Sequence, residues 1–194
     1  MNRIFKNIGT RSVLYGAHCF FIHPWFVALA WWKLYGFPYD PRLWIAFIAH
    51  DLGYIGKPNM DGPEGEMHPY RGASIMGALF GHKWFEFTLY HSRFLAKKNG
   101  GQYSKLCVAD KYAFQLTPRW LYLPMVNWTG EIKEYMKLAE SGKYADENRV
   151  TTSQVAWHQG VVDYMAKWIE QHKEIKQDTW TKTERVADST GAYK

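Results

Sequence analysis

The chain has 194 residues, a length that fits one domain with a single sizeable core and is short for two full domains. Hydrophobic residues make up 47% and charged residues 22% of the chain, which excludes a disordered, collagen-like or low-complexity protein. The formal net charge of +6 favours an anionic partner, such as a phosphorylated ligand, a nucleic acid or an acidic surface. A basic solvated surface explains the charge equally well, because the positive residues are scattered along the chain.

Cysteine usage favours a reducing compartment, and the apolar segments are too short to span a membrane. Cys19 and Cys107 lie far apart and form no CxxC pair, so the sequence indicates neither a disulfide framework nor a thiolate zinc site. The N-terminal region lacks a small-residue cleavage site, and we therefore read no signal peptide. The longest apolar run, residues 20–32, is interrupted by His23 and Pro24 and falls short of a bilayer span. We expect a cytoplasmic protein without a membrane span.

Apolar residues recur at helical spacing along the chain, which predicts an all-α fold without internal repeats. The first helical region is predicted over residues 11–35. Asp40 as an N-cap and Pro41 at the first helical position predict a second helix that ends near Asp51. The Gly-, Pro-, Asn- and Asp-rich residues 53–67 predict a loop, and a loop of that length is usually functional or mobile.

Five more helices are predicted after this loop. Their expected ranges are 68–80, 83–98, 104–116, 128–140 and 153–175. Pro118 and Pro124 are expected to bracket a connection. The prediction is thus one helical domain over residues 1–178, with a motif core at 18–116, C-terminal helices at 128–177, and a polar, flexible tail at 179–194.

The His50-Asp51 pair closes a strongly apolar helix. An imidazole next to a carboxylate is costly to bury there unless the two groups are paired or bind a metal, and a metal is the simpler solution. His68 and His91 lie on separate predicted helices, and Asp110 is the only acidic residue in an apolar run. Helical bundles build metal sites from one ligand per helix that converge on the interior, so these residues are candidate ligands.

Three ordered motifs resemble the HD-domain superfamily, whose helical bundle carries a His, a His-Asp pair and a distant Asp and binds one or two divalent metals. They are His23-Pro-Trp-Phe-Val27-Ala28, Phe47-Ile-Ala-His50-Asp51-Leu-Gly53 and Val108-Ala-Asp110-Lys. Two further segments, His68-Pro-Tyr-Arg-Gly72-Ala73 and Tyr90-His91-Ser, resemble the additional histidines of the binuclear branches. Those branches include bacterial dinucleoside tetraphosphate hydrolases, cyclic-dinucleotide phosphodiesterases and mixed-valent di-iron oxygenases. The resemblance covers about residues 23–110.

The resemblance implies an HD-like bundle with two metal sites that share Asp51 as a bridge. The implied ligand sets are His23, His50, Asp51 and Asp110 for one metal, and Asp51, His68 and His91 for the other. His18, five residues before His23, is an alternative first ligand, because Pro24 would perturb a continuous helix at His23. Nitrogen and oxygen ligands without thiolate favour iron or manganese, with zinc, cobalt or magnesium also compatible.

Cations near these motifs are the candidates for phosphate recognition. They are Lys57, Arg71, Arg93 and Lys111. Asp51, Lys57 and Arg93 are predicted to be catalytic residues. The loop acids Asp61, Glu64 and Glu66 either complete a metal shell, position water or close over substrate, or are merely solvated, and His82 is assigned to the surface or to helix capping.

The leading functional hypothesis is an enzyme, a metal-dependent phosphohydrolase that acts on a nucleotide or another small phosphoester. A metal pair would activate a water for attack and neutralise charge on the phosphoryl group, so no side-chain nucleophile is needed. The alternatives are an HD-type mixed-valent di-iron oxygenase and a non-catalytic nucleotide-binding or regulatory module. Nucleic acid fits the charge, but no recognition motif is apparent. The aromatic pairs at 25–26, 31–32 and 84–85 are assigned to the core or to a homodimer contact, with base stacking as the less favoured use.

Overall fold

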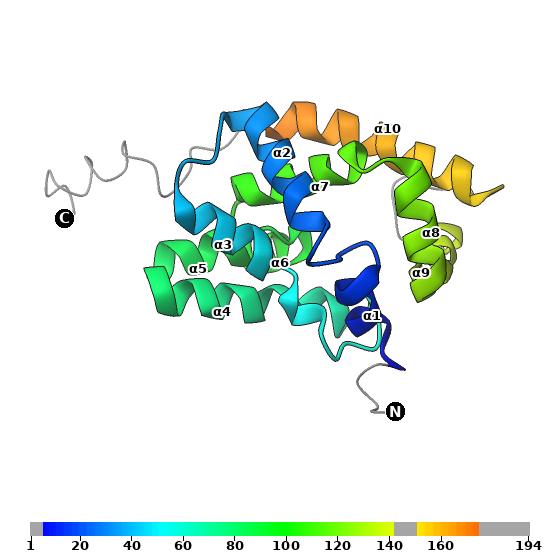
Figure 1. Cartoon of the computed structure of the whole chain (residues 1–194), viewed down its shortest axis with the longest axis horizontal. Coiled ribbons are helices and arrows are strands. Elements are labelled where there is room, and N and C mark those ends of the chain that lie inside the picture. Colours follow the sequence, from blue (N-terminus) through cyan, green and yellow to red (C-terminus); the bar gives the residue numbers. More distant parts are fainter. Residues whose placement is uncertain (1–5, 142–150, 175–194) are drawn as a thin grey trace, which may run out of the picture.

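The computed structural model describes residues 6–141 and 151–174, and every regular element within these ranges is a helix (Figure 1). The predicted all-α fold class is confirmed. The helices are α1 (Ile8–Tyr15), α2 (His23–Tyr35), α3 (Pro41–Ala49), α4 (Pro69–Phe80), α5 (His82–Leu89), α6 (Arg93–Lys98), α7 (Lys105–Leu116), α8 (Arg119–Thr129), α9 (Glu131–Glu140) and α10 (Gln154–His172). Two short 3-10 turns, Leu52–Tyr54 and Gly65–Met67, lie between α3 and α4.

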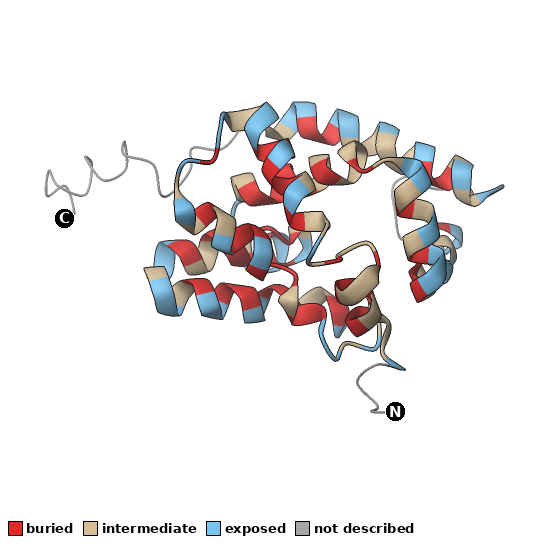
Figure 2. Ribbon diagram, in the orientation of Figure 1, coloured by how far each residue is buried: buried red, intermediate tan, exposed pale blue. Residues whose placement is uncertain are grey.

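Helices α2, α3, α4, α5 and α7 enclose the first hydrophobic core. In Figure 1, α2 and α7 lie against each other near the centre, and α4 runs beside α5 at the lower left. Figure 2 shows that the buried residues of these helices face one another across the interior. Phe47, Met76, Leu106 and Val27 are among the fully buried side chains of this core. The core therefore fixes the ends of α2 and α3, from which several candidate ligands project.

A second core lies among α1, α8, α9 and the beginning of α10, on the right of Figure 1. Val13, Val126, Ile132 and Trp157 are buried in it, and Tyr54 joins it from the loop that follows Asp51. Helices α8, α9 and α10 face the end of the first core (Figure 1). The candidate site lies where the two cores meet.

Several predicted helix boundaries are confirmed. Asp40 caps α3 by accepting a hydrogen bond from the Arg42 backbone N–H at 2.9 Å, as its position before Pro41 indicates. Ser104 caps α7 in the same way, by accepting from the Cys107 backbone N–H. The predicted tail at 179–194 lies outside the described residues. None of the described helices combines the length and the apolar character that are needed to cross a bilayer.

The prediction of one continuous helical region over 11–35 is wrong. The chain leaves the helix at Gly16, whose backbone is extended, and α2 starts only at His23. Pro24 then falls in the first turn of α2, where a helix loses nothing by its missing N–H. Pro24 therefore starts this helix and does not interrupt it.

Two other boundaries also differ from the prediction. The helix predicted over 83–98 is divided into α5 and α6, because Ser92 has extended backbone and caps α6 by accepting from the Leu95 backbone N–H. Pro124 lies inside α8 and not in a connection. Its side chain is exposed, so the carbonyl that loses its helical partner there can be solvated. The break before α6 holds His91, one of the candidate ligands.

Candidate metal centre

The six candidate ligands converge from five parts of the chain. His23 opens α2, His50 and Asp51 follow α3, His68 precedes α4, His91 lies between α5 and α6, and Asp110 lies on α7. All are buried except His23, which is partly buried. Most of them stand at helix ends, where the backbone leaves the helix and lets the side chains turn inward. The predicted set thus comes together in space, although His50 and Asp51 are the only neighbours in sequence.

Two glycines allow the turn that carries His50 and Asp51 to approach α4. A Cβ atom on Gly53 would overlap the carbonyl oxygen of His68, and one on Gly72 would overlap the carbonyl oxygen of Ala49. Any side chain at either position would push the His50-Asp51 turn away from His68. Both glycines belong to the motifs that carry the family resemblance, and their role here is close backbone packing.

The first group of donor atoms consists of His23, His50, Asp51 and Asp110. One ligand atom from each residue lies within 4.8 Å of the others. Oδ2 of Asp51 is 3.4 Å from Nε2 of His23 and 3.0 Å from Nε2 of His50. Oδ1 of Asp110 is 3.0 Å from the same nitrogen of His23 and 3.8 Å from that of His50. Two carboxylate oxygens and two imidazole nitrogens therefore face a common point.

The second group consists of Asp51, His68 and His91. Oδ1 of Asp51 is 3.4 Å from Nε2 of His68 and 3.5 Å from Nε2 of His91. The ring of His68 is further fixed by stacking on Tyr54, with ring centroids 3.7 Å apart. Because Oδ2 of Asp51 serves the first group and Oδ1 the second, this one carboxylate joins both groups.

Backbone carbonyl groups set the tautomers of three of these histidines. Nδ1 lies 3.0 Å from the Phe47 carbonyl oxygen in His50, 2.7 Å from that of Gly65 in His68, and 2.5 Å from that of Thr88 in His91. A carbonyl oxygen only accepts hydrogen bonds, so each Nδ1 must carry the proton. The Nε2 lone pairs of the neutral rings therefore point into the centre, as in metal-binding histidines whose other nitrogen donates to the backbone.

The centre contains polar atoms that the protein alone does not satisfy. Nε2 of His68 and Nε2 of His91 lie 3.1 Å apart, and in the neutral rings both atoms are acceptors. Nε2 of His50 and Oδ2 of Asp51 lie 3.0 Å apart, and both are buried acceptors without a hydrogen bond while the His50 ring is neutral. Burial lowers the pKa of His91 to about 4, which disfavours a proton as the bridge between the two rings. A cation in each of the two groups would satisfy all four atoms, so the residues fit metal binding.

The carboxylates of the centre require positive charge. Burial raises the pKa of a carboxyl group, but the neighbouring His50 outweighs burial and holds the pKa of Asp51 well below its usual value. Conversely, burial opposes protonation of His50, yet Asp51 and Asp110 raise the pKa of its imidazole to about 10. Without metal, the charge of the two carboxylates is thus offset by a proton on His50 and by the Lys111 ammonium beside Asp110, and a divalent cation would displace the His50 proton.

His18, the alternative first ligand, belongs to neither group of donor atoms. The Ser12 hydroxyl donates to Oε2 of Glu131 at 2.9 Å and accepts from Nδ1 of His18 at 2.8 Å. Burial is the main reason that the pKa of His18 is lowered, to about 3, so its ring is neutral. The geometry thus selects His23 over His18 as the first member of the candidate ligand set.

A cavity of about 620 Å³ opens beside the centre and exposes His23, Asp51, His68, His91 and Asp110 to it. The opposite wall is mostly aromatic and aliphatic. It comes largely from α7 to α10, through Phe114, Tyr122, Tyr135, Trp157, Val161, Tyr164 and Met165. The sequence did not predict this wall, because it forms only when the C-terminal helices pack against the motif core.

Of the four predicted phosphate contacts, Arg93 and Lys111 line the cavity and Lys57 and Arg71 do not. Arg71 is exposed on α4, and Lys57 lies beside the start of α1, where its carbonyl oxygen accepts from the Gly9 backbone N–H. A cation that is close in sequence to a candidate ligand therefore does not always point into the cavity. Lys97 also lines the cavity and was missed, although it lies one helical turn after Arg93 on α6.

Two of the cavity cations, Arg93 and Lys111, are held by other side chains. Arg93 donates to the Tyr164 hydroxyl at 2.7 Å, and its guanidinium lies 5.1 Å from the centroid of the Trp168 ring. Lys111 donates to Oδ2 of Asp110 at 2.6 Å. Their charged ends are thus placed by α10 and by a candidate ligand, respectively.

The loop acids have different positions. Asp61 and Glu66 line the cavity, whereas Glu64 accepts from the Asn59 side chain at 2.6 Å and does not line it. His82 is the exposed first residue of α5, as predicted.

No family model, no curated protein and no solved structure matches this chain, so its chemistry rests on the geometry described above.

Proposed function

We propose that this chain is a metal-dependent phosphohydrolase of the HD type that binds two metal ions and acts on a nucleotide or another small phosphoester. The carrying observation is Asp51, whose two carboxylate oxygens face two separate groups of imidazole nitrogens. Such a bridging carboxylate is suited to two neighbouring cations. A single ion held by His23, His50, Asp51 and Asp110 would leave the facing lone pairs of His68 and His91 without a partner.

The ligand chemistry supports iron or manganese. Both groups offer imidazole nitrogen and carboxylate oxygen, and neither contains a thiolate, since Cys19 and Cys107 are absent from them. Two such ions, when bound, lower the pKa of a water and offset the charge on a phosphoryl oxygen.

The residues around the cavity support a phosphoester substrate. Arg93 and Lys97 project from one face of α6 toward the cavity, and an arginine can bind two phosphate oxygens at once. The aromatic wall opposite the centre would hold the organic part of the substrate and exclude water around it. The cavity thus has a polar end with cations and an apolar wall. This combination fits a substrate in which a phosphate group carries an organic substituent.

The first test is the metal content of protein purified without chelator or affinity tag, measured by mass spectrometry. We expect close to two iron or manganese ions per chain. Phosphate release from a panel of nucleotides and of simple phosphoesters, such as bis-p-nitrophenyl phosphate, then tests the activity. Protein that binds no metal after reconstitution with each candidate ion would refute the proposal, and metal-loaded protein that consumes oxygen but releases no phosphate would identify an oxygenase.

A further inference from the structure

One face of α2 and the segment that follows it carry exposed apolar side chains. Trp25, Leu29 and Trp32 lie four and three residues apart, so they share one side of the helix. Phe37 and Tyr39 follow in the connection, and Ile48 lies on α3. We call these six residues the aromatic face. Their exposed fractions range from 37% to 86%.

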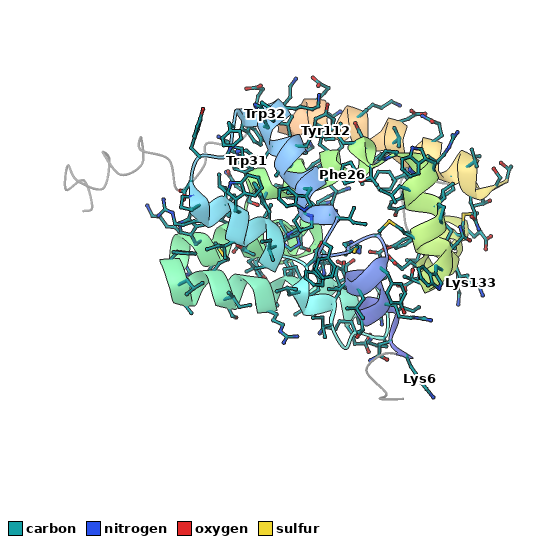
Figure 3. The ribbon with its side chains drawn as sticks, in the orientation of Figure 1. Lys6, Phe26, Trp31, Trp32, Tyr112 and Lys133 are labelled. Carbon is teal, nitrogen blue, oxygen red and sulfur yellow. The ribbon has the colours of Figure 1, made fainter. Side chains whose placement is uncertain are left out.

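Ring contacts connect the aromatic side chains of this face. The ring of Trp32 lies 5.8 Å from that of Phe37, which lies 4.9 Å from that of Tyr39. Trp44, half-buried beneath the face, contacts Trp25 at 5.8 Å and donates its indole N–H to the Pro38 carbonyl oxygen at 2.9 Å. Figure 3 labels Trp32 on the outside of α2 and its neighbour Trp31, which is buried. Ring contacts therefore join Trp32, Phe37 and Tyr39, and Trp25 with Trp44, while Leu29 lies between the two tryptophans on α2 and Ile48 lies one turn after Trp44 on α3.

The size of the aromatic face matches what a dimer needs. With large aromatic side chains of about 200 Å² each, these exposed fractions correspond to roughly 600 Å² of apolar surface. That is at the upper end of what a monomer usually exposes in one patch, about 300–600 Å². A standard interface takes about 800 Å² from each partner, of which about 65% is apolar in homodimers.

The charges around the aromatic face favour another protein surface over a lipid surface. Lys33 is the only charged residue in residues 21–39. At the border, Asp40 and Arg42 pair with each other at 2.6 Å and leave little net charge. A helix that lies on a membrane carries many Lys and Arg residues beside its apolar face, and this one does not. Two copies of such an apolar and almost uncharged face can pack together without repulsion between like charges.

We propose that the aromatic face is the contact between two copies of this chain, related by a two-fold axis that passes next to Leu29. Trp25 and Trp32 lie on opposite sides of Leu29, four and three residues away. Antiparallel packing of the two α2 helices therefore sets Trp25 of one copy against Trp32 of the other. Phe37, Tyr39 and Ile48 extend the contact on either side of the helix pair.

The test uses the full chain with its metal, measured by sedimentation equilibrium and by light scattering. We expect a dimer that Tyr39→Lys weakens at least tenfold and that Trp32→Lys converts to a monomer. Trp120→Lys is the matched control, because Trp120 is 77% exposed on α8, outside the aromatic face, and this variant should remain dimeric. Circular dichroism and metal content should be unchanged in all three variants.

Cross-linking tests the position of the axis. Leu29→Cys should give an intermolecular disulfide or a short bis-maleimide link, whereas Trp120→Cys should not. The native Cys19 and Cys107 are buried and should give no such link.

A wild-type chain that stays monomeric up to about 100 µM, well above the dissociation constants of stable dimers, would overturn the proposal. So would a dimer that survives Trp32→Lys but dissociates in Trp120→Lys. For a monomeric chain, co-sedimentation with anionic vesicles would assign the face to lipid. Dimerisation only after removal of residues 175–194 would assign it to the chain's own C-terminus.

Discussion

Lys111 donates to Oδ2 of Asp110 at 2.6 Å, while Oδ1 of the same carboxylate lies 3.0 Å from Nε2 of His23. The lysine thus determines which oxygen of Asp110 faces the candidate metal centre. The interaction also lowers the pKa of Asp110 well below its usual value, although burial alone would raise it. Lys111 is therefore a positioning residue for Asp110 as well as a cation in the cavity wall.

This relationship predicts that Lys111→Met weakens metal binding at the site of His23 and Asp110 by about 10- to 100-fold, the usual effect of losing a group that orients a ligand. A competitive chelator titration measures the affinity. Lys111→Arg should retain more of it, because a guanidinium also donates to a carboxylate. Equal affinity in the wild type and the methionine variant would contradict the positioning role.

The two oxygens of Asp51 predict different metal contents for two substitutions. Asp51→Ala should lose both metals and all activity while the fold survives, since this residue belongs to both donor groups. His91→Ala should lose only the metal of the second group. Mass spectrometry of the metal per chain and circular dichroism measure the two properties. If Asp51→Ala keeps both metal and turnover, the site is assigned wrongly.

The convergence of the six candidate ligands could be predicted because each motif carries a chemically distinctive residue, in five of the six cases at or next to a helix end. The packing that surrounds them could not. Arg71 lies three residues after His68, yet its side chain is exposed outside the cavity, because a helix sends residues three apart to similar but not identical directions. Tyr164 holds Arg93 from 71 residues away, and no periodicity in the sequence reveals that contact.

The break between α5 and α6 is a second example. The apolar pattern continues through residues 83–98, so it predicts one helix. The local cap at Ser92 and the hydrogen bond from His91 to the Thr88 carbonyl override that pattern. At this break between α5 and α6, Nε2 of His91 lies 3.1 Å from Nε2 of His68. A residue of the candidate metal centre thus departs from the regular structure that its neighbours favour.

The cavity predicts different effects for substitutions of Arg93 and Lys57, although the sequence analysis assigned both residues to phosphate recognition. Arg93→Ala should lower kcat/KM for phosphoester hydrolysis by about 10- to 100-fold, because a hydrogen bond to a charged group is worth about 1.5–3 kcal/mol. Lys57→Ala, outside the cavity, is the matched control and should leave turnover unchanged. Both variants should keep the wild-type metal content. An equal loss of activity in both would show that substrate reaches beyond the cavity described here.

Glu131 predicts a stability effect that is separate from metal binding. Its buried carboxylate accepts hydrogen bonds from Ser12, Thr129 and Tyr135 and from the Ala17 backbone N–H, and so joins α9 to the segment that carries His18. Glu131→Ala removes this acceptor from Ser12, Tyr135 and the Ala17 N–H, whereas Thr129 keeps the Val126 carbonyl oxygen. We expect it to lower the free energy of unfolding by about 2–3 kcal/mol, measured by chemical denaturation.

The same residue predicts a pH dependence. Burial raises the pKa of Glu131 above its ordinary value of 4.5, even though its hydrogen bonds act in the opposite direction. The folded protein therefore binds this proton more tightly than the unfolded chain, so the associated stability is present at low pH and is lost as the pH rises through the folded pKa. Glu131→Gln cannot titrate. The unfolding free energy of the wild type minus that of this variant should fall as the pH rises from about 4.5 and level off once Glu131 is ionised. A difference that rises over this range would mean that the hydrogen-bond donors outweigh burial and that Glu131 is held as a carboxylate.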